Sequence, residues 1–367
     1  MSMKLKELEK VDTGILGTLT ELGHEQVVFC QDAATGLKAI IAIHNTTLGP
    51  ALGGTRMWNY ATEQDAITDV LRLSRGMTFK AAISGLNLGG GKAVIIGDAN
   101  KLKTEAFMRR FGKFVQSLGG KYYTAEDVNM KTTDMEYIAM ETKYVTGLPE
   151  SMGGGGDPSP VTAYGVYLGM KAGAKRVFGS DSLSGKKVGV QGVGQVGAHL
   201  VELLAKENAV VSITDISQEK MKIVSIEHGA RPVSQSEFYD LDLDIYAPCA
   251  LGATLNDETI PRLKCALIAG AANNQLKEEV KHGYMLMDRS ITYAPDFLIN
   301  AGGLINVYSE FLGNYNRQRA YQQTEKIYDT CSSIFSMADE EKISSQEAAI
   351  KLSEKRIADM GKVRIPR

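Results

Sequence analysis

The sequence predicts an α/β fold of two domains. Its 367 residues, 44% hydrophobic and 23% charged, have the composition of a globular protein with room for about two domains. Residues 187–215 follow the order strand, tight turn, helix, strand, and the turn contains G-x-G-x-x-G. Residues 153–160 hold four glycines followed by two prolines, which cannot continue a helix or a central strand. We therefore expect an N-terminal α/β domain over residues 1–150 and a doubly wound, Rossmann-type domain over 151–337. Residues 338–367 are expected to form a helix that packs back on the first domain.

Composition and charge narrow the classes of partner. The formal net charge is −2 and basic residues form no long run, which argues against nucleic acid or an anionic membrane. No stretch has membrane-spanning length, and residues 1–10 lack the apolar core of a secretory signal. The cysteines and histidines are scattered, without C-x-x-C or paired histidines at ligand spacing, so neither disulfides nor a metal are expected. A cytoplasmic protein with a small-molecule partner fits best.

The first elements follow from periodicity and turn residues. Residues 24–30 and 37–44 are predicted as a β-hairpin. The glycine-rich segment 48–56 is expected to be a loop that lines a site, with an inert connector as the alternative. Thr62 and Asp65 form a capping-box pattern, so a helix is predicted after them.

Two lysines flank a run of glycines. Lys80 and Lys92 lie on either side of residues 89–91, and an apolar strand is predicted directly after Lys92. Because glycine is costly to order, a triple glycine suggests that the backbone passes close to something. The alternative is a surface turn with two solvated lysines. A phosphate-binding loop is excluded, since Leu86 and Ala93 stand where that motif needs a glycine and a hydroxyl.

A helix from Thr104 to the glycines at 119–120 is predicted next, followed by a strand over residues 122–128. The strand ends in adjacent carboxylates, Glu126 and Asp127. Ligand-binding residues of open α/β sheets gather at the carboxyl ends of strands, so this pair is a candidate for chemistry. A helix cap or a solvated turn is the alternative.

The second half begins with a predicted helix from Pro160 to Phe178. In the glycine motif, Gly192 allows the tight turn, Gly194 lets a pyrophosphate approach the backbone, and Gly197 lets the helix pack on the strand. Asp215 ends the next strand, where a carboxylate binds ribose hydroxyls and repels a 2′-phosphate, so NAD is expected rather than NADP. Further strands are predicted near residues 244–249, 266–269 and 291–294, and long helices over 315–338 and 344–360.

With these elements in place, the chain resembles a known family. Residues 88–98 resemble the active-site signature of the glutamate, leucine, phenylalanine and valine dehydrogenases, and the likeness is greatest to the leucine-specific members. The resemblance covers nearly the whole chain. Further motifs match in order at residues 78–80, 124–128, 158–165, 192–197, 247–252, 273–276 and 294–303.

The resemblance implies an NAD-dependent enzyme that reversibly deaminates L-amino acids to 2-oxo acids and ammonia. It also implies assembly as a homo-octamer, with substrate binding and oligomerisation in the N-terminal domain. It makes Lys92 the catalytic lysine, Lys80 the lysine that binds the substrate carboxylate, and Asp127 the acid–base carboxylate. Physical reasoning agrees, because a second ammonium nearby and apolar strand neighbours would disfavour the charged form of Lys92. Lys92 would then be able to act as a base near neutral pH.

The remaining site residues are also implied by the resemblance. The substrate side chain would contact Leu52, Gly53, Ala125, Leu304 and Val307, and Asn300 would lie near the substrate amino group. The cofactor would contact Thr162 and Asn274 near the nicotinamide, and Gly192, Val193, Gly194, Gln195, Val196, Gly197 and Asp215 elsewhere. The pocket positions are apolar or lack a side chain, which argues against glutamate and favours leucine, valine and isoleucine.

Some positions depart from the pattern of leucine enzymes. Residues 129–130 are Asn-Met where Gly-Thr is usual, Gly91 stands where a small residue such as alanine or serine is usual, and Leu304 replaces a usual valine. Gly91 and Leu304 both also occur among phenylalanine enzymes. Phenylalanine is therefore the alternative substrate. A non-catalytic NAD-binding sensor is the alternative of another class.

Overall fold

The computed structural model describes residues 14–250 and 252–363. Two of the predictions involve residues outside this range. The argument against a secretory signal used residues 1–10, and the 247–252 motif includes position 251. The chain folds into two compact units. Unit 1 holds the described residues up to Thr78 together with Gly89–Tyr144, and unit 2 holds Phe79–Leu88 together with the described residues from Val145. The functional boundaries expected at residues 150 and 337 stay predictions.

Unit 1 is built on a five-stranded mixed sheet with the order β1-β2-β4-β3-β5. Neighbours β1, β2 and β4 are antiparallel, whereas β4, β3 and β5 are parallel. The strands are β1 Gln26–Asp32, β2 Leu37–Asn45, β3 Ala51–Trp58, β4 Gly89–Ile96 and β5 Tyr122–Glu126. The hairpin and the strand after residue 121 are thus confirmed.

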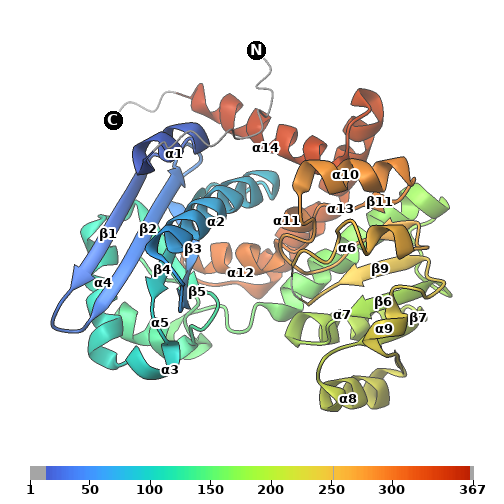
Figure 1. Cartoon of the computed structure of the whole chain (residues 1–367), viewed down its shortest axis with the longest axis horizontal. Coiled ribbons are helices and arrows are strands. Elements are labelled where there is room, and N and C mark those ends of the chain that lie inside the picture. The colour runs from blue at the N-terminus through green and yellow to red at the C-terminus, as the bar shows by residue number, and fades with distance from the viewer. Residues whose placement is uncertain (1–13, 251, 364–367) are drawn as a thin grey trace. The chain divides into compact units, whose positions relative to one another are not determined.

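Helix α2 (Glu63–Ile83) packs on one face of this sheet (Figure 1), where its Val70 and Leu71 join Ile40 and Val94 in a buried apolar cluster. The start of α2 confirms the predicted capping box: the Asp65 N–H donates to the Thr62 hydroxyl, and the Thr62 N–H donates to the Asp65 carboxylate. The last residues of α2 belong to unit 2.

The other helices of unit 1 are α1 Ile15–Leu22, α3 Ala99–Leu102, α4 Glu105–Ser117 and α5 Thr132–Ala139. Helix α4 begins as predicted, because the Thr104 hydroxyl accepts a hydrogen bond from the Phe107 N–H. Its buried face includes Phe107, Phe111 and Val115, so these side chains belong to the core of unit 1.

One glycine-rich segment was mispredicted. Residues 48–56 were expected to be a loop, but most of them form β3 in the interior of the sheet. The glycines at 89–91 are the first residues of β4, so the alternative of a surface turn is wrong. The reason is close packing. A Cβ added to Gly53 would lie 1.7 Å from the Gly91 carbonyl oxygen, and one added to Gly90 would lie 2.1 Å from the Thr78 hydroxyl of α2. The inference that the glycine run passes close to something is confirmed.

Unit 2 is built on a six-stranded sheet with the order β11-β10-β9-β6-β7-β8, all parallel. The strands are β6 Lys187–Gln191, β7 Val210–Thr214, β8 Arg231–Pro232, β9 Ile245–Pro248, β10 Leu267–Ile268 and β11 Thr292–Tyr293. From β6 the chain moves to β7 on one side, and from β9 it moves to β10 on the other. This reversal is the switch point of a doubly wound sheet, which confirms the predicted fold class.

The helices of unit 2 include α6 Ser159–Phe178, which confirms the prediction from Pro160. The others are α7 Gln195–Lys206, α8 Gln218–His228, α9 Gln235–Phe238, α10 Glu279–Asp288, α11 Asp296–Ile299, α12 Gly302–Phe311, α13 Arg317–Glu341 and α14 Ser345–Gly361, with two 3₁₀ turns, η1 Glu150–Met152 and η2 Ile260–Arg262. None of the helices in the described part of the chain is long and apolar enough to cross a bilayer.

The last helix contacts the end of α2. The Arg356 guanidinium of α14 donates to the carbonyl oxygens of Ala82 at 3.1 Å and Leu86 at 2.7 Å. These residues fall within the predicted first domain by number but group with unit 2 in the structure. Packing of residues 338–367 on the first domain therefore stays a prediction.

Candidate active site

In unit 1, neighbouring strands bring together three charged side chains. Lys92 lies on β4, Arg56 near the end of β3, and Asp127 directly after β5. The Lys92 Nζ is 2.8 Å from the Asp127 Oδ2, and the Arg56 Nε donates to the same oxygen at 3.0 Å. The Lys92 side chain is only 7% exposed. The structure thus joins the two residues predicted to be catalytic.

Arg56 was missed as a site residue, because it lies in the segment that was predicted to be a loop. Besides Asp127, its guanidinium contacts Asp69 of α2 at 3.0 Å, and Asp69 also accepts a hydrogen bond from the Tyr60 hydroxyl at 2.7 Å. This network ties Asp127 to α2 through Arg56. The resemblance assigned the nearby Leu52 and Gly53 to the substrate, but nothing in the sequence singled out Arg56 itself.

The surroundings of Asp127 favour its ionised form. Burial alone raises the pKa of this carboxyl, but the opposite charges of Lys92 and Arg56 outweigh burial and hold the pKa below its usual value. Asp127 is therefore an anion between two cations. The sequence argument that the charged form of Lys92 is disfavoured relied on a second ammonium, that of Lys80. In unit 1, the charged group in contact with the Lys92 Nζ is the carboxylate of Asp127.

Two of the predicted pocket residues of unit 1 lie on the same sheet face as Lys92. Leu52 pairs with Gly90 of β4, and Ala125 pairs with Gly54 of β3, so Leu52, Lys92 and Ala125 all point to one face. Leu52 and Ala125 are buried. Gly53 points to the opposite face, against the Gly91 carbonyl, so the lack of a side chain at Gly53 serves strand packing.

In unit 2, predicted substrate residues meet at one asparagine. The Lys80 Nζ donates to the Asn273 Oδ1 at 3.2 Å, and the Asn300 Nδ2 donates to the same oxygen at 2.8 Å. Leu304 is buried and Val307 half-buried on α12, the helix that follows Asn300. Asn273 itself was missed, although it lies in a motif that carried the resemblance.

Thr162 of α6 packs against the start of α12. A Cβ added to Gly303 would lie 3.0 Å from the Thr162 hydroxyl oxygen, and one added to Gly302 would lie 2.1 Å from the Val161 carbonyl oxygen. Thr162 is thus held close to the helix that carries Leu304. Asn274, predicted near the nicotinamide, is exposed and has a left-handed backbone with φ of 52°.

Asn300 keeps a buried acceptor. Its Nδ2 group is hydrogen-bonded, whereas its Oδ1 atom is buried without a hydrogen-bond partner among the described residues. A buried unsatisfied acceptor costs about 1–3 kcal/mol. The arrangement fits a ligand that donates a hydrogen bond, such as an amino group.

The dinucleotide motif has the geometry that a pyrophosphate requires. Gly192 has φ of 98°, and an added Cβ would lie 2.7 Å from the Ala250 nitrogen of the loop after β9. A Cβ on Gly197 would lie 2.0 Å from the Gly192 carbonyl oxygen. By contrast, nothing lies within 4 Å of a Cβ on Gly194, the residue before α7. The backbone at the helix N-terminus is thus open to an anion, and Val193, Gln195 and Val196 flank it.

Asp215 follows β7 beside this motif. Its Oδ2 accepts a hydrogen bond from the Val193 N–H at 2.8 Å, and its Oδ1 accepts one from the Ser217 N–H at 2.8 Å. A carboxylate can accept about four hydrogen bonds, so capacity for two hydroxyl donors remains. The fingerprint and Asp215 together fit a dinucleotide with an unphosphorylated ribose.

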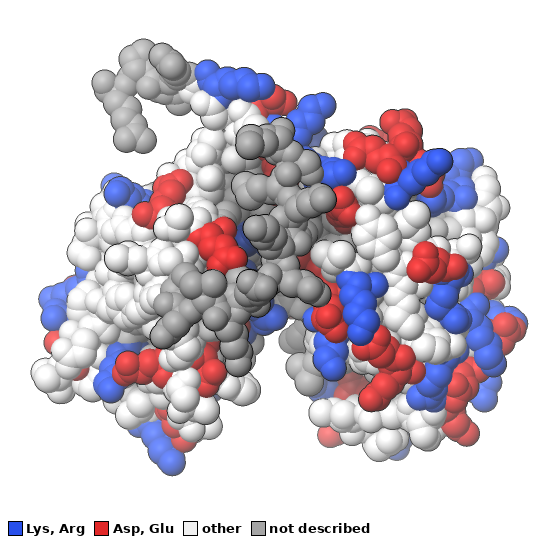
Figure 2. All heavy atoms as spheres, turned by 45° about the horizontal axis from the view of Figure 1, so that its top comes forward, with Lys and Arg blue, Asp and Glu red and all other residues white. Residues whose placement is uncertain are grey.

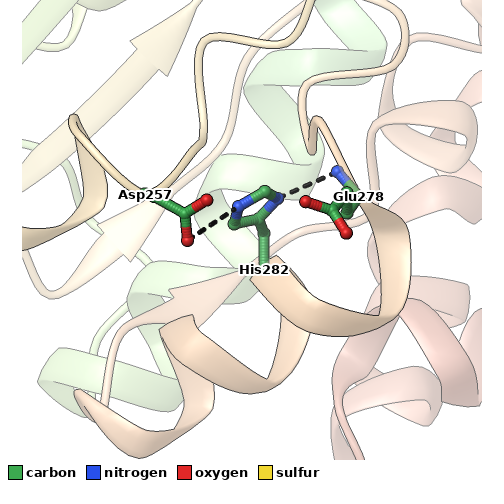
Figure 3. Close-up of side chains that lie close together, drawn as sticks. All are labelled: Asp257, Glu278 and His282. Carbon is green, nitrogen blue, oxygen red and sulfur yellow. Dashed lines mark hydrogen bonds and ion pairs between the residues drawn. The ribbon is translucent and has the colours of Figure 1, made fainter.

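A separate cluster in unit 2 has the residue types of a metal site. Asp257, Glu278 and His282 have ligand atoms within 4.8 Å of one another (Figure 3). However, the His282 Nδ1 accepts a hydrogen bond from the Glu278 N–H at 2.9 Å, so the neutral ring carries its proton on Nε2, the atom that faces Asp257. The Lys281 ammonium already contacts both carboxylates. These contacts explain the cluster as an ion-pair network, and the expected lack of a metal stays a prediction.

The surface shows no strong bias of charge on the face drawn in Figure 2. Acidic and basic side chains are interspersed over the described residues of both units. On this face, the described residues form no basic patch of the kind that nucleic-acid binders present.

Comparisons with known proteins agree with this geometry. Residues 24–144 match the family model described as the dimerisation domain of Glu/Leu/Phe/Val dehydrogenases. Residues 153–218 and 212–364 match the model of Glutamate/Leucine/Phenylalanine/Valine dehydrogenase.

Individual relatives cover nearly the full chain. The leucine dehydrogenase of Geobacillus stearothermophilus is 55% identical over 94% of this chain and 93% of its own. The valine dehydrogenase of Streptomyces virginiae is 49% identical over 96% of this chain and 99% of its own. The crystal structure of L-tryptophan dehydrogenase from Nostoc punctiforme has a TM-score of 0.84 at 46% identity and covers 95% of this chain and 100% of that one. The chain belongs to the glutamate/leucine/phenylalanine/valine dehydrogenase family.

Proposed function

We propose that the protein catalyses the reversible, NAD-dependent oxidative deamination of branched-chain L-amino acids to 2-oxo acids and ammonia. The observation that carries the proposal is the buried Lys92–Asp127 pair in unit 1 of a chain whose unit 2 has an open dinucleotide fingerprint. Membership of a dehydrogenase family supports the reaction type. The leucine and valine dehydrogenases among its relatives support the substrate class.

The charged residues have complementary tasks in this reaction. Removing a hydride from the Cα of the amino acid leaves an iminium, and water must then add to it. Lys92 activates that water, Asp127 accepts and returns the protons, and the resulting carbinolamine releases ammonia to give the 2-oxo acid. Lys80 binds the substrate carboxylate, and the orphaned Asn300 Oδ1 accepts a hydrogen bond from the substrate amino group.

The cofactor would be held by the fingerprint and supply the hydride acceptor. Gly194 and the N-terminus of α7 would bind its pyrophosphate, flanked by Val193, Gln195 and Val196. Asp215 would bind the adenosine ribose, and its negative charge would oppose a 2′-phosphate. Thr162 and Asn274 are assigned to the nicotinamide end by family resemblance.

Substrate choice follows from the character of the residues that the resemblance assigns to the substrate side chain. In unit 1, Leu52 and Ala125 are buried and apolar, and in unit 2 Leu304 is buried and Val307 half-buried. None of them offers a cation to a second carboxylate, whose burial without one is costly, so glutamate is disfavoured. One methylene changes binding by about 1–3 kcal/mol, so leucine, valine and isoleucine should all be turned over.

An aromatic substrate is the second candidate. The Nostoc punctiforme relative is named for L-tryptophan. The family resemblance adds that Gly91 and Leu304 also occur among phenylalanine enzymes. A panel of L-amino acids followed by NADH absorbance separates the candidates. Turnover led by leucine, valine and isoleucine supports the proposal, whereas turnover led by phenylalanine or tryptophan overturns the substrate assignment. NADH binding without turnover of any amino acid would indicate a non-catalytic sensor.

We further infer a cytoplasmic homo-octamer from the family resemblance. The family model for residues 24–144 is described as a dimerisation domain, which supports self-association. Light scattering of the purified protein tests the assembly, and a monomeric or dimeric mass would contradict the octamer.

A further inference from the structure

Asn273 lies between two residues to which the proposed function gives different parts of one substrate. Its Oδ1 accepts a hydrogen bond from the Lys80 Nζ at 3.2 Å and from the Asn300 Nδ2 at 2.8 Å. The assignment of this atom as oxygen is physically required, because a lysine ammonium has only donors and must face an acceptor. One oxygen therefore links the residue that would bind the carboxylate to the residue that would bind the amino group.

The segment around Asn273 is held by buried side chains. Gln275 is fully buried, and its Nε2 donates to the carbonyl oxygens of Gly270 at 2.8 Å and Ala272 at 3.0 Å. The Gln275 N–H in turn donates to the Oδ2 of the buried Asp296 at 3.0 Å. The backbone that carries Asn273 is thus fixed on both sides, although the Asn273 side chain itself is exposed.

Asn300 is oriented by the same segment. Its Nδ2 donates to the Ala271 carbonyl oxygen at 3.0 Å as well as to Asn273, so its Oδ1 points away from both. A lysine side chain has four rotatable bonds and loses considerable entropy when ordered, so the position of the Lys80 ammonium depends on the groups that it contacts. A fixed acceptor beside Asn300 restricts where the Lys80 ammonium can lie.

We propose that Asn273 is a positioning residue that holds the Lys80 ammonium at a fixed place beside Asn300, so that the pair recognises a carboxylate and an amino group on one carbon. The inference rests on the proposed function and adds the residue that makes the site selective for α-amino acids. Asn273 contributes no proton and no charge. Its role is to set the spacing between two groups that touch the substrate.

Two substitutions test the proposal in the full-length protein. Asn273→Ala removes the acceptor, so the KM for L-leucine should rise about tenfold while the Kd for NADH stays within twofold of wild type. Asn273→Asp keeps the shape and the acceptor but adds a negative charge that pairs with Lys80 and competes with the substrate carboxylate. The KM for L-leucine should therefore rise in this variant too, and more steeply at low salt. Asn100→Ala, at an exposed position of α3, is the control for a surface asparagine.

A carboxylate that lacks the amino group extends the test. The Ki of 4-methylpentanoate as a competitive inhibitor should rise in Asn273→Ala, because Lys80 is no longer held in place. An unchanged KM in either variant, an unchanged Ki, or a parallel loss of NADH affinity would overturn the proposal. If wild type turns over no amino acid, the proposed function fails instead, so the two failures are distinguishable.

Discussion

The Lys92 Nζ and the Asp127 Oδ2 lie 2.8 Å apart, and the Arg56 Nε approaches the same oxygen at 3.0 Å. Both cations use Oδ2, and no described residue hydrogen-bonds to Oδ1. The carboxylate is thus fixed through one oxygen and keeps the other available to water or substrate. An acid–base group must stay in place while it exchanges protons, so it needs both a fixed oxygen and an available one.

Replacing Lys92 by alanine should abolish deamination while NAD binding persists. A positioned acid–base side chain contributes about 10²–10⁴-fold to the rate, so kcat should fall at least a hundredfold. The measurement is NADH formation with L-leucine, together with NADH binding by fluorescence.

Lys103→Ala is the matched control for the loss of a half-buried lysine. The Lys103 side chain is 14% exposed and pairs with Asp134 in the same unit, so its removal should lower the melting temperature without the loss of turnover. Near-normal activity in Lys92→Ala would remove Lys92 from the mechanism.

Replacing Arg56 by glutamine should move the acid limb of the pH–rate profile to higher pH. Burial raises the pKa of Asp127, and Lys92 and Arg56 lower it further than burial raises it. Without Arg56, one of the two lowering charges is lost, so the pKa rises and the carboxylate form is lost at a higher pH. A shift of about one pH unit is expected from one charge in contact.

Arg72→Gln is the control for the Arg56 variant, since Arg72 contacts Asp69 at 3.6 Å and is 65% exposed. It should leave the acid limb in place. If the limb does not move in Arg56→Gln either, the group that titrates there is not Asp127.

Most of the architecture followed from sequence patterns, because periodicity and caps act locally. The capping box at Thr62 and the start of a helix at Thr104 were predicted and are present. The segment that became β3 was missed, because its glycines look like a turn until the neighbouring strand is known. Only the sheet shows that the Gly91 carbonyl occupies the place of a side chain at Gly53.

The site residues likewise fall into those that local sequence motifs identified and those that they did not. Lys92 and Asp127 were found because they lie in strong local motifs, and the resemblance supplied their roles. Arg56 and Asn273 were not found, because their contribution lies in contacts with residues distant in sequence: Asp127 for Arg56, and Lys80 for Asn273. A single sequence carries no signal for such contacts.

Replacing Asp215 by asparagine should weaken the preference for NAD over NADP. Asparagine keeps one side-chain acceptor for the Val193 or Ser217 N–H, both of which Asp215 binds at 2.8 Å, but removes the charge that opposes a 2′-phosphate. The ratio of kcat/KM for NAD to that for NADP should fall about tenfold. Asp215→Ala should lower the ratio as well and also lose affinity for both cofactors, because neither N–H keeps its acceptor.

Ser217→Ala is the control for Asp215→Asn. It removes the cap of α8, where the Ser217 hydroxyl accepts a hydrogen bond from the Lys220 N–H, but leaves the Asp215 charge in place. The cofactor ratio should not change in this variant. An unchanged ratio in Asp215→Asn would place the selectivity elsewhere.

Replacing Gly91 by alanine should destabilise the protein without changing its substrate order. Gly91 departs from the small residue usual in leucine enzymes, which raised phenylalanine as an alternative substrate. In the structure, a Cβ on Gly91 would lie 2.7 Å from the ring of the buried Tyr122 and 3.1 Å from the Ala51 Cβ, on the sheet face opposite to Lys92. The Tyr122 ring cannot easily move, because its hydroxyl donates to the Gly53 carbonyl oxygen at 2.6 Å.

Overpacking of a core typically costs about 1–3 kcal/mol, so the free energy of unfolding in denaturant should fall by that amount in Gly91→Ala. Combining it with Tyr122→Leu should make the alanine less costly than it is in the wild-type background, which a double-mutant cycle measures. The ratio of kcat/KM for leucine to that for phenylalanine should stay as in wild type. A changed ratio would mean that Gly91 shapes the substrate pocket, whereas an unchanged ratio leaves substrate choice to residues such as Leu304.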